Sequence, residues 1–258
     1  MDNISKKKII MLTSNGPSSY NMYNGLKNDF DISHVIVEGS GSIKTFLKKR
    51  VKRLGYIRVF GQILFSKLLL PFLKWESKQR VHEITETHQL QFEDFDLDKK
   101  INVPSVNSEE CIKYLQQINP DIVIVNGTRI ISKKVLNSIS GIFINTHMGI
   151  TPLYRGVHGG YWSKVNKDEH CGVSVHLVDQ GIDTGGILRQ GLIETTTKDN
   201  FITYTYLQMA KGCELMKLVI TDILNDGPKT IKNNLESKIW THPTIWFYLK
   251  HRIFNGVK

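Results

Sequence analysis

The chain is poor in cysteine, in acidic residues and in long apolar runs, and each shortage excludes a class of protein. Its 258 residues include only three cysteines, which are far apart: Cys111, Cys171 and Cys213. Cysteines at such spacing form neither a disulfide framework nor a paired metal site. No group of His and Cys has the spacing of a zinc ligand set. We therefore expect a reduced, cytoplasmic protein without a bound metal.

Apolar runs are too short for a membrane span. The longest, at residues 63–73, is interrupted by Lys67, whereas a spanning helix needs roughly 20 apolar residues. The apolar run at residues 9–12 is also too short for the core of a signal peptide. These lengths favour a buried or interfacial helix at residues 63–73. We therefore expect that no segment inserts across a membrane.

Acidic residues are outnumbered by basic ones. The chain has 34 Lys and Arg against 24 Asp and Glu, which gives a formal net charge of +10. The excess gathers in residues 44–78 and in the tail at residues 250–258. Positive charge favours anionic partners such as nucleic acid, anionic lipid or phosphorylated small molecules, although a basic run can also be a solvated helix face. The charge alone leaves these alternatives open for residues 44–78.

Apolar segments alternate with helical ones along the chain. Strands are predicted at residues 8–14, 33–38, 121–126, 141–145, 173–178 and 187–193, and helices near residue 18 and at 43–88, 109–118, 132–137 and 201–224. This order predicts an α/β fold, namely a Rossmann-like, mostly parallel twisted sheet flanked by helices with a short helical C-terminal tail. Because residues 225–228 form a helix stop, we expect a catalytic domain at residues 1–228 and a tail at 229–258 packed on it.

Polar residues follow several of the predicted strands. Asn145 and His147 stand two apart at the end of an apolar run, and Asp183 follows in a glycine-rich loop. Residues i and i+2 of a strand point to the same face, so Asn145 and His147 can reach one reacting carbon. Ligands of open α/β sheets bind at the carboxyl ends of the strands. We expect Asn126, the Asn-x-His pair and the loop after Val178 to meet there.

This set of side chains suits acyl transfer to an amine. The reaction develops negative charge on a carbonyl oxygen, so the site must donate hydrogen bonds to it and remove a proton from the attacking nitrogen. Asn145 can donate without changing its charge, and His147 can donate or accept a proton near neutral pH. Asp183 can orient His147 or take the proton through water. Since no Ser or Cys nucleophile is evident, direct attack by a substrate amine is the simpler scheme.

Two neighbouring features have plainer interpretations. His176 alternates with apolar residues of its predicted strand and is interpreted as a structural histidine. The loop at residues 179–185 alone could be a capped turn, because Gly and Asp dominate turns. A functional site is favoured because this loop occurs together with the segment at residues 151–156.

Residues 141–190 resemble the catalytic core of the folate-dependent formyltransferases, which include glycinamide ribonucleotide, methionyl-tRNA and sugar-nucleotide formyltransferases. The shared pattern is Asn-x-His, Pro-x-x-Arg-Gly and Asp-x-Gly-x-Asp-Thr-Gly, here at residues 145–147, 152–156 and 179–185. The resemblance implies the formyltransferase fold, 10-formyltetrahydrofolate as formyl donor, and Asn145, His147 and Asp183 as catalytic residues. It also implies two loops that wrap the pterin, largely through their backbone: Asn126, Gly127, Thr128, Arg129, Ile130, Val178, Asp179, Gly181 and Ile182.

The segment after the histidine departs from many members of that family. It reads Met-Gly-Ile-Thr-Pro at residues 148–152, where many members have Ser-Leu-Leu-Pro. Residues 151–162 and 240–244 resemble stand-alone sugar-nucleotide N-formyltransferases, among them those acting on GDP-perosamine. The resemblance implies a nucleotide-linked amino sugar as acceptor, such as GDP-perosamine or a dTDP-amino sugar, for O-antigen or other surface polysaccharide synthesis. The candidate acceptor contacts are Thr13, Ser14, Asn15, Thr151, Tyr154, Arg155, Gly156 and His158.

Three other functions stay open at this point. A methionyl-tRNA formyltransferase would suit the positive charge, but only about 30 residues follow Pro228, which is short for an RNA-binding domain. A folate-deformylating hydrolase usually carries a further domain ahead of the first strand. A non-enzymatic protein could bind a membrane surface through residues 44–78. We expect no nucleic-acid partner, peripheral membrane association at most, and a homodimer that uses residues 60–73 and the aromatic tail.

Overall fold

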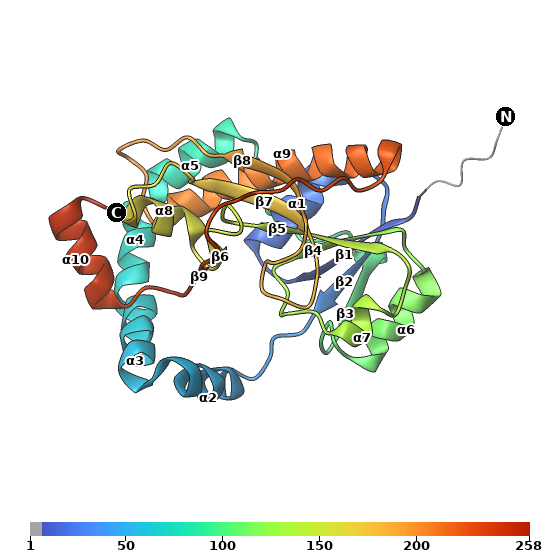
Figure 1. The fold of residues 1–258 in the computed structure, drawn as a ribbon, viewed down its shortest axis with the longest axis horizontal. Helices are drawn as coiled ribbons and strands as arrows, with labels where there is room; N and C mark the ends of the chain where they lie inside the picture. The colour runs from blue at the N-terminus through green and yellow to red at the C-terminus, as the bar shows by residue number, and fades with distance from the viewer. Residues whose placement is uncertain (1–6) are drawn as a thin grey trace.

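A seven-stranded sheet forms the centre of the computed structural model, which describes residues 7–258 (Figure 1). The strand order is β3-β2-β1-β4-β5-β7-β8. The strands are β1 Ile9–Ser14, β2 Ile32–Glu38, β3 Lys100–Val103, β4 Ile122–Asn126, β5 Ile142–His147, β7 Gly172–Leu177 and β8 Ile187–Leu192. The pairs from β3 to β5 are parallel, whereas β7 and β8 run antiparallel. The predicted mostly parallel α/β fold is confirmed.

Helices cover both faces of this sheet and extend beyond it (Figure 1). They are α1 Pro17–Leu26, α2 Ile43–Leu54, α3 Tyr56–Leu64, α4 Leu70–Glu76, α5 Lys78–Thr87, α6 Glu109–Ile118, α7 Lys133–Leu136, α8 Gly159–Val165, α9 Thr203–Asp226 and α10 Ile245–Asn255. A π turn, η1 Phe65–Leu69, joins α3 to α4, and a 3-10 turn, η2 Leu97–Lys99, precedes β3. A second, two-stranded sheet pairs β6 Arg155–Gly156 with β9 Ile239–Trp240.

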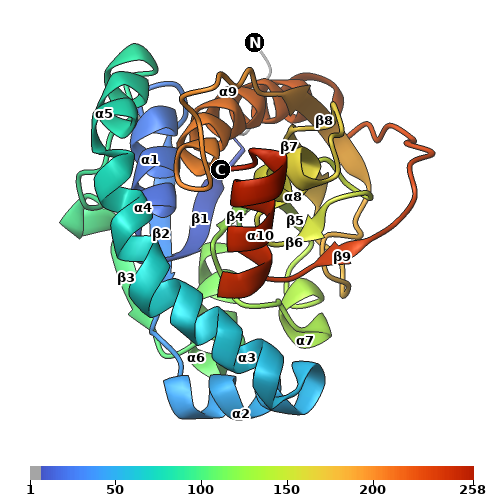
Figure 2. The same cartoon turned by 90° about the vertical axis from the view of Figure 1, so that its left-hand side faces the viewer.

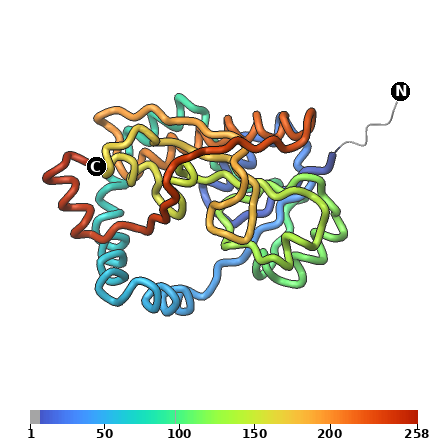
Figure 3. The backbone as a smooth tube through the Cα atoms, viewed as in Figure 1, coloured from blue at the N-terminus to red at the C-terminus, as the bar shows by residue number. Residues whose placement is uncertain are grey.

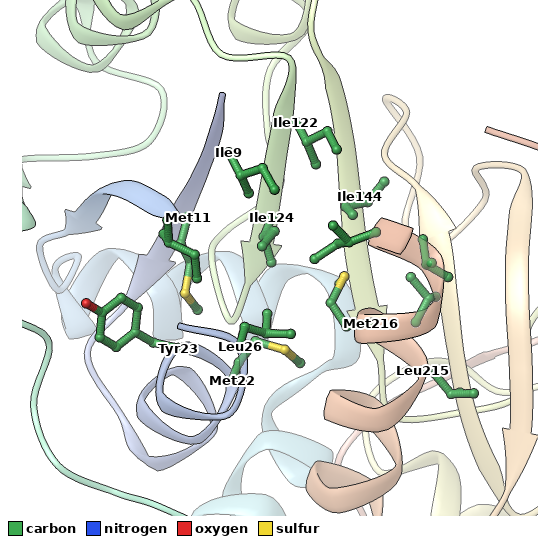
Figure 4. Packing of buried hydrophobic residues seen from close by; sticks show 14 of the residues in the cluster. Ile9, Met11, Met22, Tyr23, Leu26, Ile122, Ile124, Ile144, Leu215 and Met216 are labelled. Carbon is green, nitrogen blue, oxygen red and sulfur yellow. The ribbon is translucent and has the colours of Figure 1, made fainter. Parts of the chain in front are cut away.

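The central strands are buried on both faces, which explains their unbroken apolar sequences. Along β1, Ile9 and Met11 belong to the core cluster that also contains residues of α1 and α9, as Figure 4 shows. The alternate residues, Ile10 and Leu12, belong to the cluster on the opposite face, with residues of α6 and α7. This double burial fixes the positions of the strand ends that carry the polar residues.

Residues 43–88, predicted as one helical stretch, form several helices. Gly55, with φ +79°, separates α2 from α3, and α2 to α4 lie away from the sheet (Figure 3). The helical run Tyr56–Glu76 is long and apolar enough, by length and composition, to cross a membrane. The sequence-based limit concerned only residues 63–73 and therefore did not cover a run of this length. One face of the run packs on the protein, because Phe65 and Leu73 are fully buried in a third, aromatic-rich cluster.

The C-terminal segment returns to this aromatic cluster. Trp240 Nε1 donates a hydrogen bond to the Leu153 carbonyl at 2.9 Å, and Tyr248 of α10 is fully buried beside Tyr161. Residues 229–258 therefore pack on the rest of the chain. The division at residue 228 stays a prediction, and residues 1–6 of the predicted domain lie outside the described residues.

Truncation of a sheet residue tests this core. Ile124 of β4 has no exposed surface, so Ile124→Ala should lower the free energy of unfolding by about 2–5 kcal/mol through lost burial and a residual cavity. Ile231 is 51% exposed, so the matched Ile231→Ala should cost about 0.5 kcal/mol. Urea unfolding of both variants measures the difference, and equal midpoints would contradict the core assignment.

Candidate functional site

The pairing of β5 with β7 creates the site. Asn145 lies opposite His176, and His147 lies opposite Ser174. Residues directly opposite one another, and residues two apart on one strand, share a face of the sheet. Asn145 Nδ2 accordingly lies 3.2 Å from His176 Nε2, and the rings of His147 and His176 are 6.5 Å apart between centroids. An amide and two imidazoles therefore share one side of the sheet.

His147 is held by one firm and one looser contact. Its Nε2 lies 2.6 Å from the Tyr154 carbonyl oxygen; because a carbonyl only accepts, Nε2 carries a hydrogen. Its Nδ1 lies 3.4 Å from Asp183 Oδ2, with both side chains largely buried. Nε2 is occupied by the Tyr154 carbonyl, so Nδ1 is the ring nitrogen that faces the carboxylate. An imidazole and a carboxylate placed in this way can exchange a proton with a bound substrate.

Asp183 is fixed by the backbone of the neighbouring segment. Its Oδ2 accepts a hydrogen bond from the Gly156 N–H at 2.9 Å, and its Oδ1 lies 3.8 Å from His176 Nε2. Its φ of +51° lies in the left-handed region, which Asp enters more readily than most residues. The carboxylate is thus positioned between the two histidines.

His176 lies inside the site, although its sequence pattern suggested a structural histidine. Its Nδ1–H donates to the Leu177 carbonyl at 2.7 Å, so Nε2 is free to accept from the Asn145 amide. Burial lowers the pKa of His176, against the opposing effects of the Leu177 carbonyl and Asp183. A neutral His176 orients Asn145, whose second amide hydrogen can point at a substrate oxygen. The signal that could have found it is the strand pairing, which the sequence does not give.

Gly149 is required by the turn that follows His147. A Cβ at this position would lie 2.3 Å from the Tyr154 carbonyl oxygen and 2.9 Å from His147 Nε2. Any side chain would therefore displace the hydrogen bond that holds the imidazole. The departure from the family pattern at residue 149 therefore lies next to His147, and its consequence is local packing.

The loop after Val178 starts at a different place from the one predicted. Because β7 is antiparallel to β5, its carboxyl end lies beside the first half of β5, and the Val178 N–H donates to the Phe143 carbonyl at 2.8 Å. The prediction that this loop starts at the carboxyl edge of the sheet is therefore wrong. The loop nevertheless folds back far enough to bring Asp183 to His147.

In the two loops expected to hold the pterin, polar side chains form hydrogen bonds and ion pairs within the protein. Asn126 Nδ2 donates to the Ser18 carbonyl at 3.0 Å, and Asp179 accepts from the Gly181 N–H and from Thr184. Arg129 pairs with Glu38. A pterin held largely by the backbone of these loops stays a prediction, and these side-chain contacts leave backbone groups free to make it. The other predicted contacts lie in the same two loops: Gly127, Thr128, Ile130, Val178 and Ile182.

Arg155 supplies a further polar group beside the second loop. Its Nη1 donates to the Ile182 carbonyl at 3.4 Å, while its Nε is buried without a hydrogen-bond partner in the structure. A buried donor of this kind favours a ligand oxygen. Arg155 Nε is therefore available to an oxygen of a bound ligand such as a reduced pterin.

Two of the predicted acceptor contacts are wrong for their side chains. Thr13 is fully buried, and its hydroxyl donates to the Asn126 carbonyl at 2.8 Å. Tyr154 is 1% exposed, with its hydroxyl donating to Asp168 at 2.9 Å, and its carbonyl, not its ring, reaches His147. Thr151 is also buried, but its hydroxyl has no hydrogen-bond partner among the described residues, so its contact with an acceptor stays a prediction.

His158 belongs to the aromatic cluster, which does not fit the predicted contact with an acceptor. Its ring lies 4.6 Å from Phe201 and 4.8 Å from His242 between centroids. Burial, with smaller effects from His242 and Arg50, lowers the pKa of His158 to about 3. The ring is therefore neutral near pH 7 and packs as an aromatic residue.

Ser14 and Asn15 line a cavity at the ends of β1 and β2. Its volume is about 790 Å³, and its lining also includes residues 39–42, Lys49 and Arg129. Ser14 Oγ donates to the Gly127 carbonyl at 2.8 Å, which ties this wall to the first predicted pterin loop. The cavity thus joins the predicted donor and acceptor regions and carries two cationic side chains.

Comparison with known proteins identifies the family of this arrangement. The formyl transferase family model matches residues 75–217, which include Asn145, His147, His176 and Asp183. This match confirms the family predicted from residues 141–190.

Curated relatives are similar over part of their length. The chain is 36% identical to the methionyl-tRNA formyltransferase of Finegoldia magna over 126 residues, 47% of this chain and 40% of that protein. It is 31% identical over 134 residues to the enzyme of the same name from Campylobacter jejuni, 52% of this chain and 42% of that protein. The chain therefore aligns with less than half the length of these relatives.

Solved structures share the fold at low sequence identity. A sugar N-formyltransferase from Shewanella has a TM-score of 0.57 at 14% identity, covering 90% of this chain and 76% of that chain. An N-formyltransferase from Helicobacter canadensis, solved with folinic acid and dTDP-3-aminofucose, has a TM-score of 0.54 at 21% identity, covering 91% and 70%. The phosphoribosylglycinamide formyltransferase of Streptococcus pneumoniae has a TM-score of 0.55 at 17% identity, covering 85% and 99%.

The lowered pKa of His158 predicts a pH-dependent stability. A histidine in the unfolded chain has a pKa near 6.5, so below that pH the ring is protonated in the unfolded state but stays neutral in the native state. The contribution of neutral His158 is therefore complete above about pH 6.5 and is lost as pH falls. Between pH 6.5 and 5, wild type should lose about 2 kcal/mol more unfolding free energy than His158→Phe.

Urea unfolding at pH 8, 6.5 and 5 measures this difference. Carboxylates and the other histidines are common to both proteins and cancel in the comparison. Parallel pH profiles for wild type and His158→Phe would show that the ring titrates normally in the native state.

Proposed function

The chain belongs to the formyl transferase family, and on this premise we propose that it transfers a formyl group from 10-formyltetrahydrofolate to the amine of a nucleotide-linked amino sugar. The observation that carries the proposal is the convergence of Asn145, His147 and Asp183, with His147 Nδ1 3.4 Å from the carboxylate. The folate would supply the electrophilic formyl carbon. A carbon–nitrogen bond would form to the sugar amine while the bond to the folate nitrogen breaks, and the proton that the amine loses is balanced by one that the leaving folate nitrogen gains.

The side chains divide this work according to their hydrogen bonds. Asn145, oriented by neutral His176, has one amide hydrogen left to donate to the formyl oxygen as it gains negative charge. His147 Nδ1 makes no tight hydrogen bond to Asp183, because 3.4 Å exceeds the usual N···O distance. In its protonated form, the ring can therefore also donate from Nδ1 to that oxygen. Asp183, held by Gly156, is the acceptor for the amine proton, directly or through a water molecule.

Two features support a sugar-nucleotide acceptor. The segments that resemble sugar-nucleotide N-formyltransferases meet in the structure, because Gly156 pairs with Trp240, 84 residues later, in the β6–β9 sheet. A Cβ on Gly156 would lie 2.3 Å from the Trp240 carbonyl, so the two segments fit closely. The cavity offers the Lys49 ammonium group to a diphosphate, because Arg129 is paired with Glu38 in the same lining, while Ser14 and Asn15 offer neutral hydrogen-bonding groups.

A methionyl-tRNA acceptor is the second candidate. It is favoured by the 36% identity to a methionyl-tRNA formyltransferase and by the basic residues of α2.

For the proposed transfer to an amino sugar, we place the activity in the cytoplasm, in keeping with three free cysteines. We propose that its product serves surface polysaccharide synthesis.

Substitution of the central histidine tests the chemistry. His147→Asn should lower kcat by at least about 10³-fold with little change in KM, because the proton donor is lost while the binding loops remain. His82→Asn, on an exposed face of α5, is the matched control and should retain full turnover. Mass spectrometry of the formylated product gives the rates, and a His147→Asn variant as active as His82→Asn would refute the assignment.

The acceptor is tested by offering each class of substrate to the enzyme in a separate reaction. GDP-, UDP- and dTDP-linked amino sugars and initiator methionyl-tRNA are each incubated with the enzyme and 10-formyltetrahydrofolate. We expect a formyl group, read as a 28 Da mass increase, on at least one nucleotide sugar and not on the tRNA. Formylation of the tRNA alone, with salt-sensitive binding, would establish the second candidate in its place.

A further inference from the structure

A large basic and apolar surface lies on the side of the molecule formed by α2, α3, η1, α4 and α10. In Figure 2, α3, α4 and α10 run along the side that faces the viewer. Its exposed apolar side chains are Ile43, Phe46, Tyr56, Ile57, Phe60, Ile63, Leu68, Phe72, Trp75, Trp246, Leu249, Ile253 and Phe254. We call these residues, with the Lys and Arg between them, the basic apolar surface. Soluble monomers rarely expose so many large apolar side chains together.

The helical run Tyr56–Glu76 is apolar on two opposite faces. Phe65 and Leu73 pack into the aromatic cluster. Ile57, Phe60 and Trp75 project into solvent, and Ile57 and Trp75 are 79% and 74% exposed. The exposed residues recur every three or four positions except for a five-residue step from Ile63 to Leu68, which spans the π turn η1, so they form one stripe along the helical run. A 21-residue run makes this stripe about 30 Å long.

The charges that border this stripe have one sign. Residues 40–75 contain nine Lys and Arg and no Asp or Glu, and α10 also lacks acidic residues. Glu76, at the end of the run, is paired with Arg252 of α10. Lys48, Lys52 and Arg53 of α2 are exposed. The surface therefore combines a wide apolar face with unneutralised positive charge.

We propose that the basic apolar surface docks on an anionic lipid bilayer, with the run Tyr56–Glu76 lying in the plane of the interface. The exposed apolar side chains would enter the boundary between headgroups and acyl chains, and the lysines and arginines would contact anionic headgroups. Exposed Tyr56, Trp75 and Trp246 are of the residue types enriched at this boundary. The buried face of the run keeps it attached to the protein, so it lies on the membrane and does not span it.

Charge favours the bilayer over a second copy of the chain. A two-fold symmetric dimer places the same patch against itself, so Lys48, Lys52 and Arg53 of one copy would approach those of the other. Such like-charge contacts oppose association. Anionic headgroups instead neutralise every one of these cations.

Vesicle co-sedimentation with the full chain tests the proposal. One set of vesicles contains phosphatidylcholine alone, and the other contains about 30% phosphatidylglycerol, a fraction in the range at which anionic surfaces attract polybasic segments. Wild type should bind the anionic vesicles at least about tenfold more tightly, and the binding should weaken with salt. Ile57→Ser/Phe60→Ser and Lys48→Glu/Lys52→Glu should each reduce it about tenfold or more.

Matched variants on other faces serve as controls. Leu218→Ser/Ile231→Ser and Lys133→Glu/Lys232→Glu make the same changes at exposed positions outside the basic apolar surface and should bind like wild type. Circular dichroism and formyl transfer in solution, which need none of these residues, verify that each variant is folded. Equal binding to both vesicle types, or equal losses in control and surface variants, would overturn the proposal. So would light scattering that shows a dimer dissociated by Ile57→Ser/Phe60→Ser without any vesicle binding.

Discussion

The backbone of residues 154–156 decides where the reactive pair lies. The Tyr154 carbonyl accepts from His147, and the Gly156 N–H donates to Asp183, so one short segment holds both members. Backbone groups cannot rotate away as side chains can, which suits a site that must be organised before the charge develops. The segment is in turn anchored by the Tyr154 ring, which stacks on Trp240 and donates to Asp168. Residues that touch no substrate therefore set the geometry of the chemistry.

The antiparallel pairing of β7 with β5 adds what a parallel strand could not. It brings His176 directly beside Asn145, and it makes the following loop fold back across the pair so that Asp183 meets His147. With a parallel neighbour, the next loop would start at the carboxyl edge, level with Asn126, and leave the face of β5 open. The reversal in the sheet thus encloses the polar side chains on three sides and explains the buried, neutral state of His176.

The sequence predicted the layers, the main strands and the shared face of Asn145 and His147, because each depends on a local pattern, whereas Asp183 was predicted from the resemblance of residues 179–185 to a family motif. Unbroken apolar runs identify strands buried on both faces, and the Asn-x-His spacing places two side chains on one face. The position of His176 could not be predicted, since it follows from a strand pairing between residues 31 apart. The burial of Tyr154 and the packing of His158 among aromatic rings could not be predicted either, because their partners, Trp240 and Phe201, lie more than 40 residues away in sequence. Side-chain destinations in loops depend on such distant packing, which periodicity does not encode.

One aromatic cluster connects the site with the outer helices. Trp240 stacks on Tyr154 at 5.8 Å and on Trp162 at 4.7 Å between ring centroids, and Trp162 contacts Phe247 of α10. Phe65 joins the same cluster from the run that also carries the exposed stripe. Because a close-packed cluster resists deformation, it fixes the orientation of α3, α4 and α10 relative to the segment at residues 154–156. A partner on the outer helices would therefore orient the whole enzyme while the hydrogen bonds of His147 and Asp183 stay as they are.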